Sequence, residues 1–157
     1  MPELVIESNG LIEKTAVYYN GDQLSGIKEL FLNMDENGTF DAFIQYEGAD
    51  KVLYTRNIFS DSLPNVKTSE PTFTEEEAME LQQLSIVSDG EIENTELFWN
   101  EEELDGVVSL FVQIAASKQQ SKGLSSVFSK KQQADVTCKA EITFRNEDES
   151  IETEVVF

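Results

Sequence analysis

The sequence of 157 residues predicts an all-β fold, mainly antiparallel, with one short helix. Three observations lead to this prediction: an internal repeat, apolar residues that alternate with polar ones, and turn residues at short intervals. We expect two tandem five-stranded repeats with a pseudo-two-fold relation. They should close into a sandwich or barrel-like structure and share one core.

The repeat is the strongest signal in the chain. Residues 4–34 and 84–114 align without a gap, and twelve of the 31 aligned positions are identical. Chance would give about two identities. If the second copy carries an insertion of about 18 residues, the alignment continues from 39–59 to 137–157. Both copies then end on phenylalanine, Phe59 and Phe157.

Alternation identifies the strands. In residues 137–145, Cys138, Ala140, Ile142 and Phe144 fall on one face, which is typical of a half-buried strand. The Asn37-Gly38 pair favours a tight hairpin between two strands of the first copy. The expected strands are 3–8, 11–19, 27–34, 39–46 and 51–59, then 84–88, 91–99, 107–114, 135–145 and 150–157.

Two strands of each copy are apolar on both faces. In 27–34, Phe31 points away from Leu30 and Leu32, and Phe111 stands at the equivalent place in 107–114. Strands of this kind are covered on both sides, so we expect them inside a sandwich or between the copies.

The chain between the copies predicts a helix. Thr74 followed by Glu77 forms a capping-box pattern, and three consecutive glutamates occupy the positive end of the helix. We expect a short helix over 75–83 that connects the copies. The predicted organisation is repeat 1 over 1–60, a linker over 61–83, and repeat 2 over 84–157. A half of about 57 residues buries little surface alone, so these parts should form one compact unit.

The charge of the chain bears on its partners. There are 31 acidic and 11 basic residues, giving a net charge of -20. Such a surface disfavours direct binding to nucleic acid or to an anionic membrane and suits a protein partner with a basic surface. The alternative is that acidity only maintains solubility. No signal peptide or long apolar run is visible, which predicts a cytoplasmic protein. The single cysteine, Cys138, aligns with Phe40 and is expected to be a buried apolar filler.

Catalytic signatures are missing from the sequence. The chain has no histidine, one cysteine and no glycine-rich phosphate loop, so we predict no enzyme, no catalytic residue and no cofactor. Acidic turns such as 100–106, with Glu101, Glu102, Glu103 and Asp105, are interpreted as turns, with a calcium site as the weaker alternative. We therefore predict no metal centre.

The insertion over 115–133 differs from the rest of the chain. It contains four lysines and no acid, so it carries +4 while the remaining residues carry -24. Long loops of this kind are usually either functional or disordered. The segment could bind a partner, or it could fold back on the acidic surface. The partner-binding residues predicted from the sequence are Lys118, Lys122, Leu124, Val127, Phe128, Lys130 and Lys131.

These observations favour a non-enzymatic acidic β protein that acts by protein binding, as an adaptor, assembly component or regulator. An acidic inhibitor, such as an immunity protein or a nucleic-acid mimic, is the alternative. A small-ligand binding module is the third hypothesis, and an enclosed pocket lined by converging acids would favour it.

Overall fold

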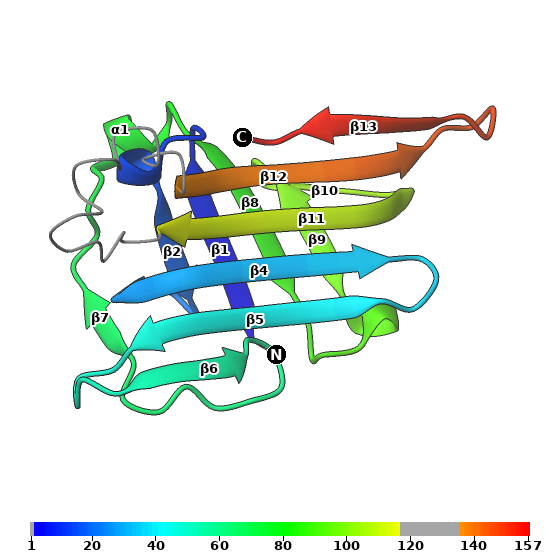
Figure 1. Cartoon of the computed structure of the whole chain (residues 1–157). Helices are drawn as coiled ribbons and strands as arrows, with labels where there is room; N and C mark the ends of the chain where they lie inside the picture. Colours follow the sequence, from blue (N-terminus) through cyan, green and yellow to red (C-terminus); the bar gives the residue numbers. More distant parts are fainter. Residues whose placement is uncertain (1, 117–135) are drawn as a thin grey trace, which may run out of the picture.

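The computed structural model describes residues 2–116 and 136–157. These residues form two sheets in which every strand pairing is antiparallel, together with one short α-helix and two 3-10 helices (Figure 1). The prediction of a mainly antiparallel β fold with one short helix is confirmed.

The seven-stranded sheet has the strand order β10-β9-β8-β1-β2-β3-β7. Its strands are β1 (Glu3–Ser8), β2 (Ala16–Tyr19), β3 (Asp22–Ser25), β7 (Lys67–Ser69), β8 (Gln82–Val87), β9 (Glu96–Trp99) and β10 (Glu102–Glu103). The 3-10 helices η1 (Ile12–Lys14) and η2 (Ile92–Asn94) precede β2 and β9.

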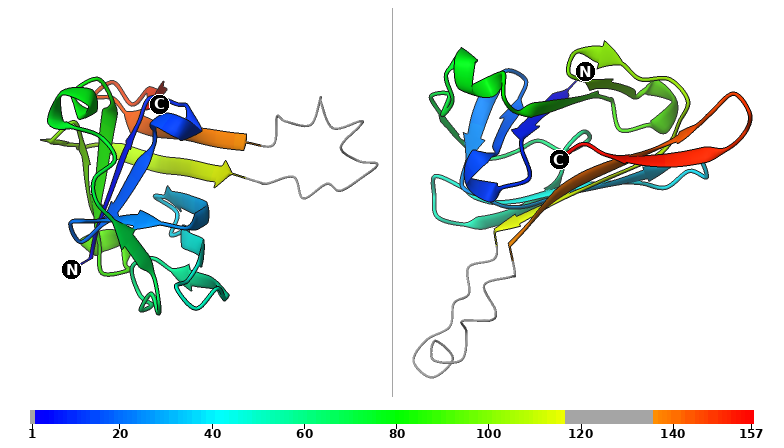
Figure 2. Two further views of the ribbon diagram at one scale, coloured as in Figure 1. Left: turned by 90° about the vertical axis from the view of Figure 1, so that its left-hand side faces the viewer. Right: turned by 90° about the horizontal axis from the view of Figure 1, so that it is seen from above.

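The six-stranded sheet has the strand order β13-β12-β11-β4-β5-β6. Its strands are β4 (Ile27–Asp35), β5 (Phe40–Glu47), β6 (Leu53–Asn57), β11 (Val107–Ala116), β12 (Val136–Arg145) and β13 (Ile151–Val155). The views along and above the sheets show the two layers stacked, and the strands of one layer cross those of the other steeply (Figures 1 and 2). This arrangement resembles the orthogonal packing of β-sandwiches.

Each sheet combines strands from both aligned segments. β1 pairs with β8 in one sheet and β4 pairs with β11 in the other, so both junctions lie near the middle of their sheets. Alternation along these strands sends apolar side chains into one core between the layers. Leu4, Leu30, Leu84 and Leu110 are all fully buried in that core.

The first predicted hairpin is present with a different turn. Asp35 and Thr39 still pair through their backbones, and Gly38 has a φ of 104°. Glu36, Asn37 and Gly38 therefore form a three-residue loop, in which a glycine with positive φ follows a turn. The Asn-Gly signal located the hairpin correctly, but the loop is one residue longer than the two-residue turn that this pair favours.

Several expected strands are shorter or divided. The range 11–19 contains η1 and then β2, and 91–99 contains η2 and then β9. The loop over 20–26 contains strand β3, which pairs with β7 inside the expected linker. The strands of the first repeat thus differ from the five that were expected. Polar segments without apolar alternation, β3 and β7, also pair with the sheet through their backbones.

The capping box forms as predicted, but the helix is short. Glu77 donates its backbone N–H to Thr74 Oγ1 at 3.1 Å, and Thr74 donates its own to Glu77 Oε1 at 2.9 Å. The helix α1 spans only Glu75–Ala78, because the chain from Gln82 onward pairs with β1 as strand β8. Competition from the sheet thus ends the helix at Ala78, five residues before the expected end at Gln83.

The outer faces of the sheets differ from the expectation of cover on both sides. Phe31 and Phe111 lie on the face of the six-stranded sheet that points away from the core, and both are half-buried. Tyr18 and Phe98 lie similarly on the seven-stranded sheet. Strands β4 and β11 lie side by side where the aligned segments meet, as expected, but these four rings are half-buried and not fully covered in the described part of the chain.

Truncation of a central core residue should test the packing. Leu32 is fully buried and lies between Val112 and Ala42 in the six-stranded sheet. We expect Leu32→Ala to lower the free energy of unfolding by about 2–5 kcal/mol, because it removes buried methyl groups and leaves a cavity. Urea denaturation followed by circular dichroism measures this loss. Met79→Ala is the control, because Met79 is 83% exposed and its truncation should change stability by less than about 0.5 kcal/mol. A similar loss for both variants would contradict the assigned core.

Candidate functional site

The partner-binding residues predicted from the sequence lie outside the described part of the chain. They are Lys118, Lys122, Leu124, Val127, Phe128, Lys130 and Lys131. Strands β11 and β12 flank this segment and pair along their length. The assignment of these residues to partner binding stays a prediction.

A cluster of aromatic rings on the outer face of the six-stranded sheet is the clearest candidate surface in the described residues. We call Phe31, Phe43, Phe111 and Lys139 the outer-face patch. Phe31 and Phe111 meet edge to face with their ring centroids 5.7 Å apart. The Lys139 ammonium lies 5.2 Å from the Phe111 centroid, within the range of a cation–π contact. Phe43 is 44% exposed.

The strand register explains why these side chains meet. Residues directly opposite one another in antiparallel strands share a face. Phe31 is opposite Phe43 on one side and Gln113 on the other, and Gln113 is opposite Lys139. The patch therefore crosses four neighbouring strands, β5, β4, β11 and β12.

Carboxylates surround the patch on the same face. The register from Phe31 and Phe111 places five acids there. They are Glu29, Asp35, Asp41, Glu47 and Glu141. The register of β12 also places two basic residues on this face: Lys139, against the Phe111 ring, and Arg145, near the end of the strand. The face thus combines an aromatic centre with an acidic margin.

Strand β13 extends the same face to the edge of the sheet. Its residues are all exposed, and Val155 is 63% exposed and opposite Glu141. Glu152 and Glu154 are opposite Phe144 and Ile142, so they project to the other face. Charged residues on an edge strand discourage pairing with further strands, which favours the face over the edge as a contact region.

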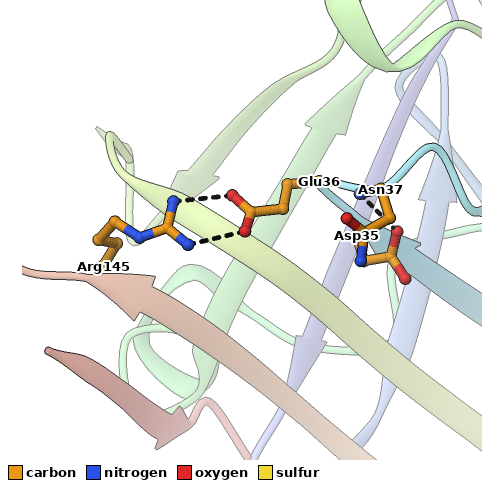
Figure 3. Close-up of polar contacts among 4 residues, drawn as sticks. All are labelled: Asp35, Glu36, Asn37 and Arg145. Carbon is orange, nitrogen blue, oxygen red and sulfur yellow. Dashed lines mark hydrogen bonds and ion pairs between the residues drawn. The ribbon is translucent and has the colours of Figure 1, made fainter. Parts of the chain in front are cut away.

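An ion pair joins two hairpins across β11. Arg145 donates to both carboxylate oxygens of Glu36, at 2.7 and 2.9 Å (Figure 3). The backbone N–H of Glu36 bonds Val108 and that of Arg145 bonds Gly106, so both partners are anchored to the beginning of β11. The bidentate bond lowers the pKa of Glu36. Asp35 shapes the adjoining turn, where its Oδ1 accepts the Asn37 N–H at 2.9 Å (Figure 3).

Cys138 packs against the core, as expected of an apolar filler, but it is not fully buried. It is half-buried, and its sulfur lies 3.3 Å from the hydroxyl oxygens of both Ser8 and Thr15. Thr15 also donates to the Leu11 carbonyl at 2.7 Å. The hydroxyls thus tie the beginning of β12 to the end of β1, and the described surroundings of the sulfur contain no base that would activate a thiol.

A second polar group lies at the β5–β6 turn. The Tyr54 hydroxyl donates to Asp50 Oδ2 at 2.5 Å, and Asn65 Nδ2 bonds both the Tyr54 oxygen and Asp50. The Tyr54 bond lowers the pKa of Asp50. These contacts fasten the turn to the chain after β6 and account for all three side chains structurally.

The acidic turns do not converge on a metal site in the part of the chain that the structure describes. No group of three or more histidine, cysteine or acidic side chains there has the geometry to hold an ion. Glu101, Glu102 and Glu103 are exposed around β10. Over the same residues, no helix has the length and apolar character needed to cross a membrane.

The sequence placed Phe31 on the opposite face of its strand from Leu30 and Leu32, with Phe111 at the equivalent place, and predicted cover on both faces. What it could not supply is the β4–β11 pairing, which brings residues 80 positions apart into ring contact. The signal that could have found the patch is the outward apolar residue repeated in both copies.

The Glu36–Arg145 pair should stabilise the fold only while Glu36 is ionised. Because its pKa is lower in the folded state, the contribution is present above the unfolded pKa and is lost as pH falls through the folded value. In a double-mutant cycle of Glu36→Gln and Arg145→Met, we expect a favourable coupling free energy at about pH 7 that decreases as the pH is lowered toward about 2. Urea denaturation at both pH values measures it. A coupling that persists unchanged in acid would contradict the assignment.

Known proteins do not supply a family for this chain. Comparisons with protein-family models, with curated protein sequences and with solved structures find no significant match. Functional inference therefore depends on the geometry described above.

Proposed function

We propose that this protein is a non-enzymatic binding module that recognises a protein partner through the outer-face patch. The observation that carries this proposal is the contact of Phe31 with Phe111 on an exposed sheet face, beside the 44% exposed Phe43. Aromatic residues are enriched among the side chains that dominate the energy of protein interfaces.

Charge on the same face favours a particular partner. Five carboxylates surround the aromatic centre, whereas Lys139 is the only base directly against the rings in the described residues. A partner with an apolar contact region and a basic margin would complement this face. Opposite charges would also accelerate association and make it sensitive to salt.

We further propose that the two halves arose by duplication and are related by a pseudo-two-fold axis. In the β1–β8 pair, Leu4 faces Ile86 and Ile6 faces Leu84, so the repeat offset of 80 exchanges the two contacts. The Ser8–Thr15 and Ser88–Thr95 hydroxyl contacts are both 2.8 Å. These equivalent contacts support the proposal. Phe31 and Phe111 would then meet at the axis between β4 and β11.

Removal of both central rings tests the proposed surface. The Phe31→Thr/Phe111→Thr variant lacks both aromatic rings. Threonine is a good strand former, so the sheet should be retained. We expect partners captured from the source lysate by the intact chain to bind the variant at least about tenfold more weakly, or about 1.4 kcal/mol. Quantitative mass spectrometry of the captured proteins, followed by titration of the purified partner, measures this change.

The matched control is Tyr18→Thr/Phe98→Thr, which removes two half-buried rings from the outer face of the other sheet. Circular dichroism and urea denaturation establish that both variants are folded. Retention of every partner by Phe31→Thr/Phe111→Thr would refute the proposal, as would equal losses for the two variants. The intact chain could instead sediment at twice 17.7 kDa, with only Phe31→Thr/Phe111→Thr returning to the monomer mass. The partner of this surface would then be a second copy of the chain.

The lysine-bearing segment predicted from the sequence has its own test. Replacement of 117–135 by a short Asn-Gly turn removes all seven predicted partner-binding residues and leaves the outer-face patch in place. If the segment contributes, the same capture experiment should show weaker binding and less dependence on salt, because four lysines are removed. An unchanged partner set would eliminate the segment from the binding surface.

A further inference from the structure

A pocket opens between the two sheets beside η2. It has a volume of about 300 Å³, and its walls are mainly apolar. We call it the η2 pocket and define it by Met34, Ile92, Leu97, Val107, Val108 and Leu110. Met34, Leu97 and Leu110 are buried, so the floor of the pocket belongs to the core. Asp35 and Glu36 lie at its margin.

The corresponding place in the first half of the chain is more closed. A pocket of about 190 Å³ lies beside η1 and includes Ile12, the residue aligned with Ile92. Leu24 and Gln23 cover it and are only 6% and 8% exposed. Gln23 exchanges two hydrogen bonds with Thr72, at 2.7 and 2.8 Å, and this holds β3 against the chain after β7.

The η2 pocket has no equivalent cover among the described residues. Strand β10 pairs there with β9 and with no other described strand. Leu104, which aligns with Leu24, is only half-buried, and the residue aligned with Gln23 is the exposed Glu103. The pocket is therefore larger because one polar anchor and one added strand are absent from this end of the described fold.

An acidic hollow adjoins the η2 pocket. It has a volume of about 370 Å³, and Glu36, Glu91 and Glu93 are among its lining residues. Glu36 and Ile92 line both spaces, so the two lie next to each other at that margin. No basic side chain lines the hollow in the described structure, and Arg145 compensates only Glu36. A side-chain hydrogen bond with Glu93, together with repulsion from Glu93 and Asp89, raises the pKa of Glu91.

We propose that the η2 pocket and the acidic hollow together bind a small amphiphilic cation, an alkyl or aryl group that ends in a primary ammonium. The apolar group would occupy the space between Ile92, Leu97 and Val108. The ammonium would then lie beside Glu91 and Glu93, which it would help to neutralise. A volume of about 300 Å³ is at the lower end of the range for ligand sites, so the apolar group must be small.

Three probes that share one alkyl group and differ in their head groups test this chemistry. They are n-hexylammonium, n-hexanol and n-hexanoate, titrated into ¹⁵N-labelled protein with amide shifts recorded by NMR. We expect hexylammonium to shift the amides of Ile92, Thr95 and Val108 and to bind at least about tenfold more tightly than hexanoate. Hexanol should be intermediate, because it keeps the apolar contact without the charge. Ammonium chloride, which has no chain, should leave these amides unshifted.

Three variants assign the site. Ile92→Trp should fill the pocket and abolish the hexylammonium shifts. Ile12→Trp, the matched change beside η1, should leave them intact. Glu91→Gln/Glu93→Gln should reduce hexylammonium affinity and leave hexanol unchanged. Circular dichroism establishes folding of each variant. Equal binding of hexanoate, shifts that follow ammonium chloride, or shifts that survive Ile92→Trp in a folded protein would each overturn the proposal.

Discussion

The structure depends on the burial of the inner faces of two sheets against each other. About 57 residues cannot bury enough apolar area to fold comfortably alone, and each sheet of this chain draws strands from both aligned segments. The β1–β8 and β4–β11 pairs lie near the middle of their sheets, so the fully buried Leu4, Leu30, Leu84 and Leu110 share one core. Cutting either junction would expose the centre of that core.

The outer face is a consequence of the same alternation. Once Leu30, Leu32 and Leu110 point inward, the pleat forces Phe31 and Phe111 outward, and the pairing of β4 with β11 places them in contact. The packing of the core therefore places an aromatic cluster on the outer face of the sheet, where its rings are not part of the core. The proposed binding role depends on these rings and on the five carboxylates that share their face.

The two ends of the sandwich differ although the segments that build them align. At the η1 end, Gln23 holds β3 beside β7 and Leu24 closes the space between the sheets. At the η2 end, glutamates occupy β10, and the space is larger. The Arg145–Glu36 pair also belongs to this end alone, since Glu47 is the residue aligned with Arg145. The two ends are therefore distinguished by different polar residues outside the core.

The sequence by itself determined the β class, the antiparallel pairing, the first hairpin and the capping box at Thr74, because these depend on local periodicity and on neighbouring residues. It also placed Phe31 on the opposite face of its strand from Leu30 and Leu32. Only the tertiary structure decided that η1 and η2 interrupt two expected strands, that β8 ends the helix early, and that polar residues form β3 and β7. Only the tertiary structure placed Phe31 against Phe111, Glu36 against Arg145, and Ile92 at the margin of the acidic hollow. Each of these contacts links residues far apart in the chain or depends on sheet packing, and local sequence patterns carry no information about such pairings.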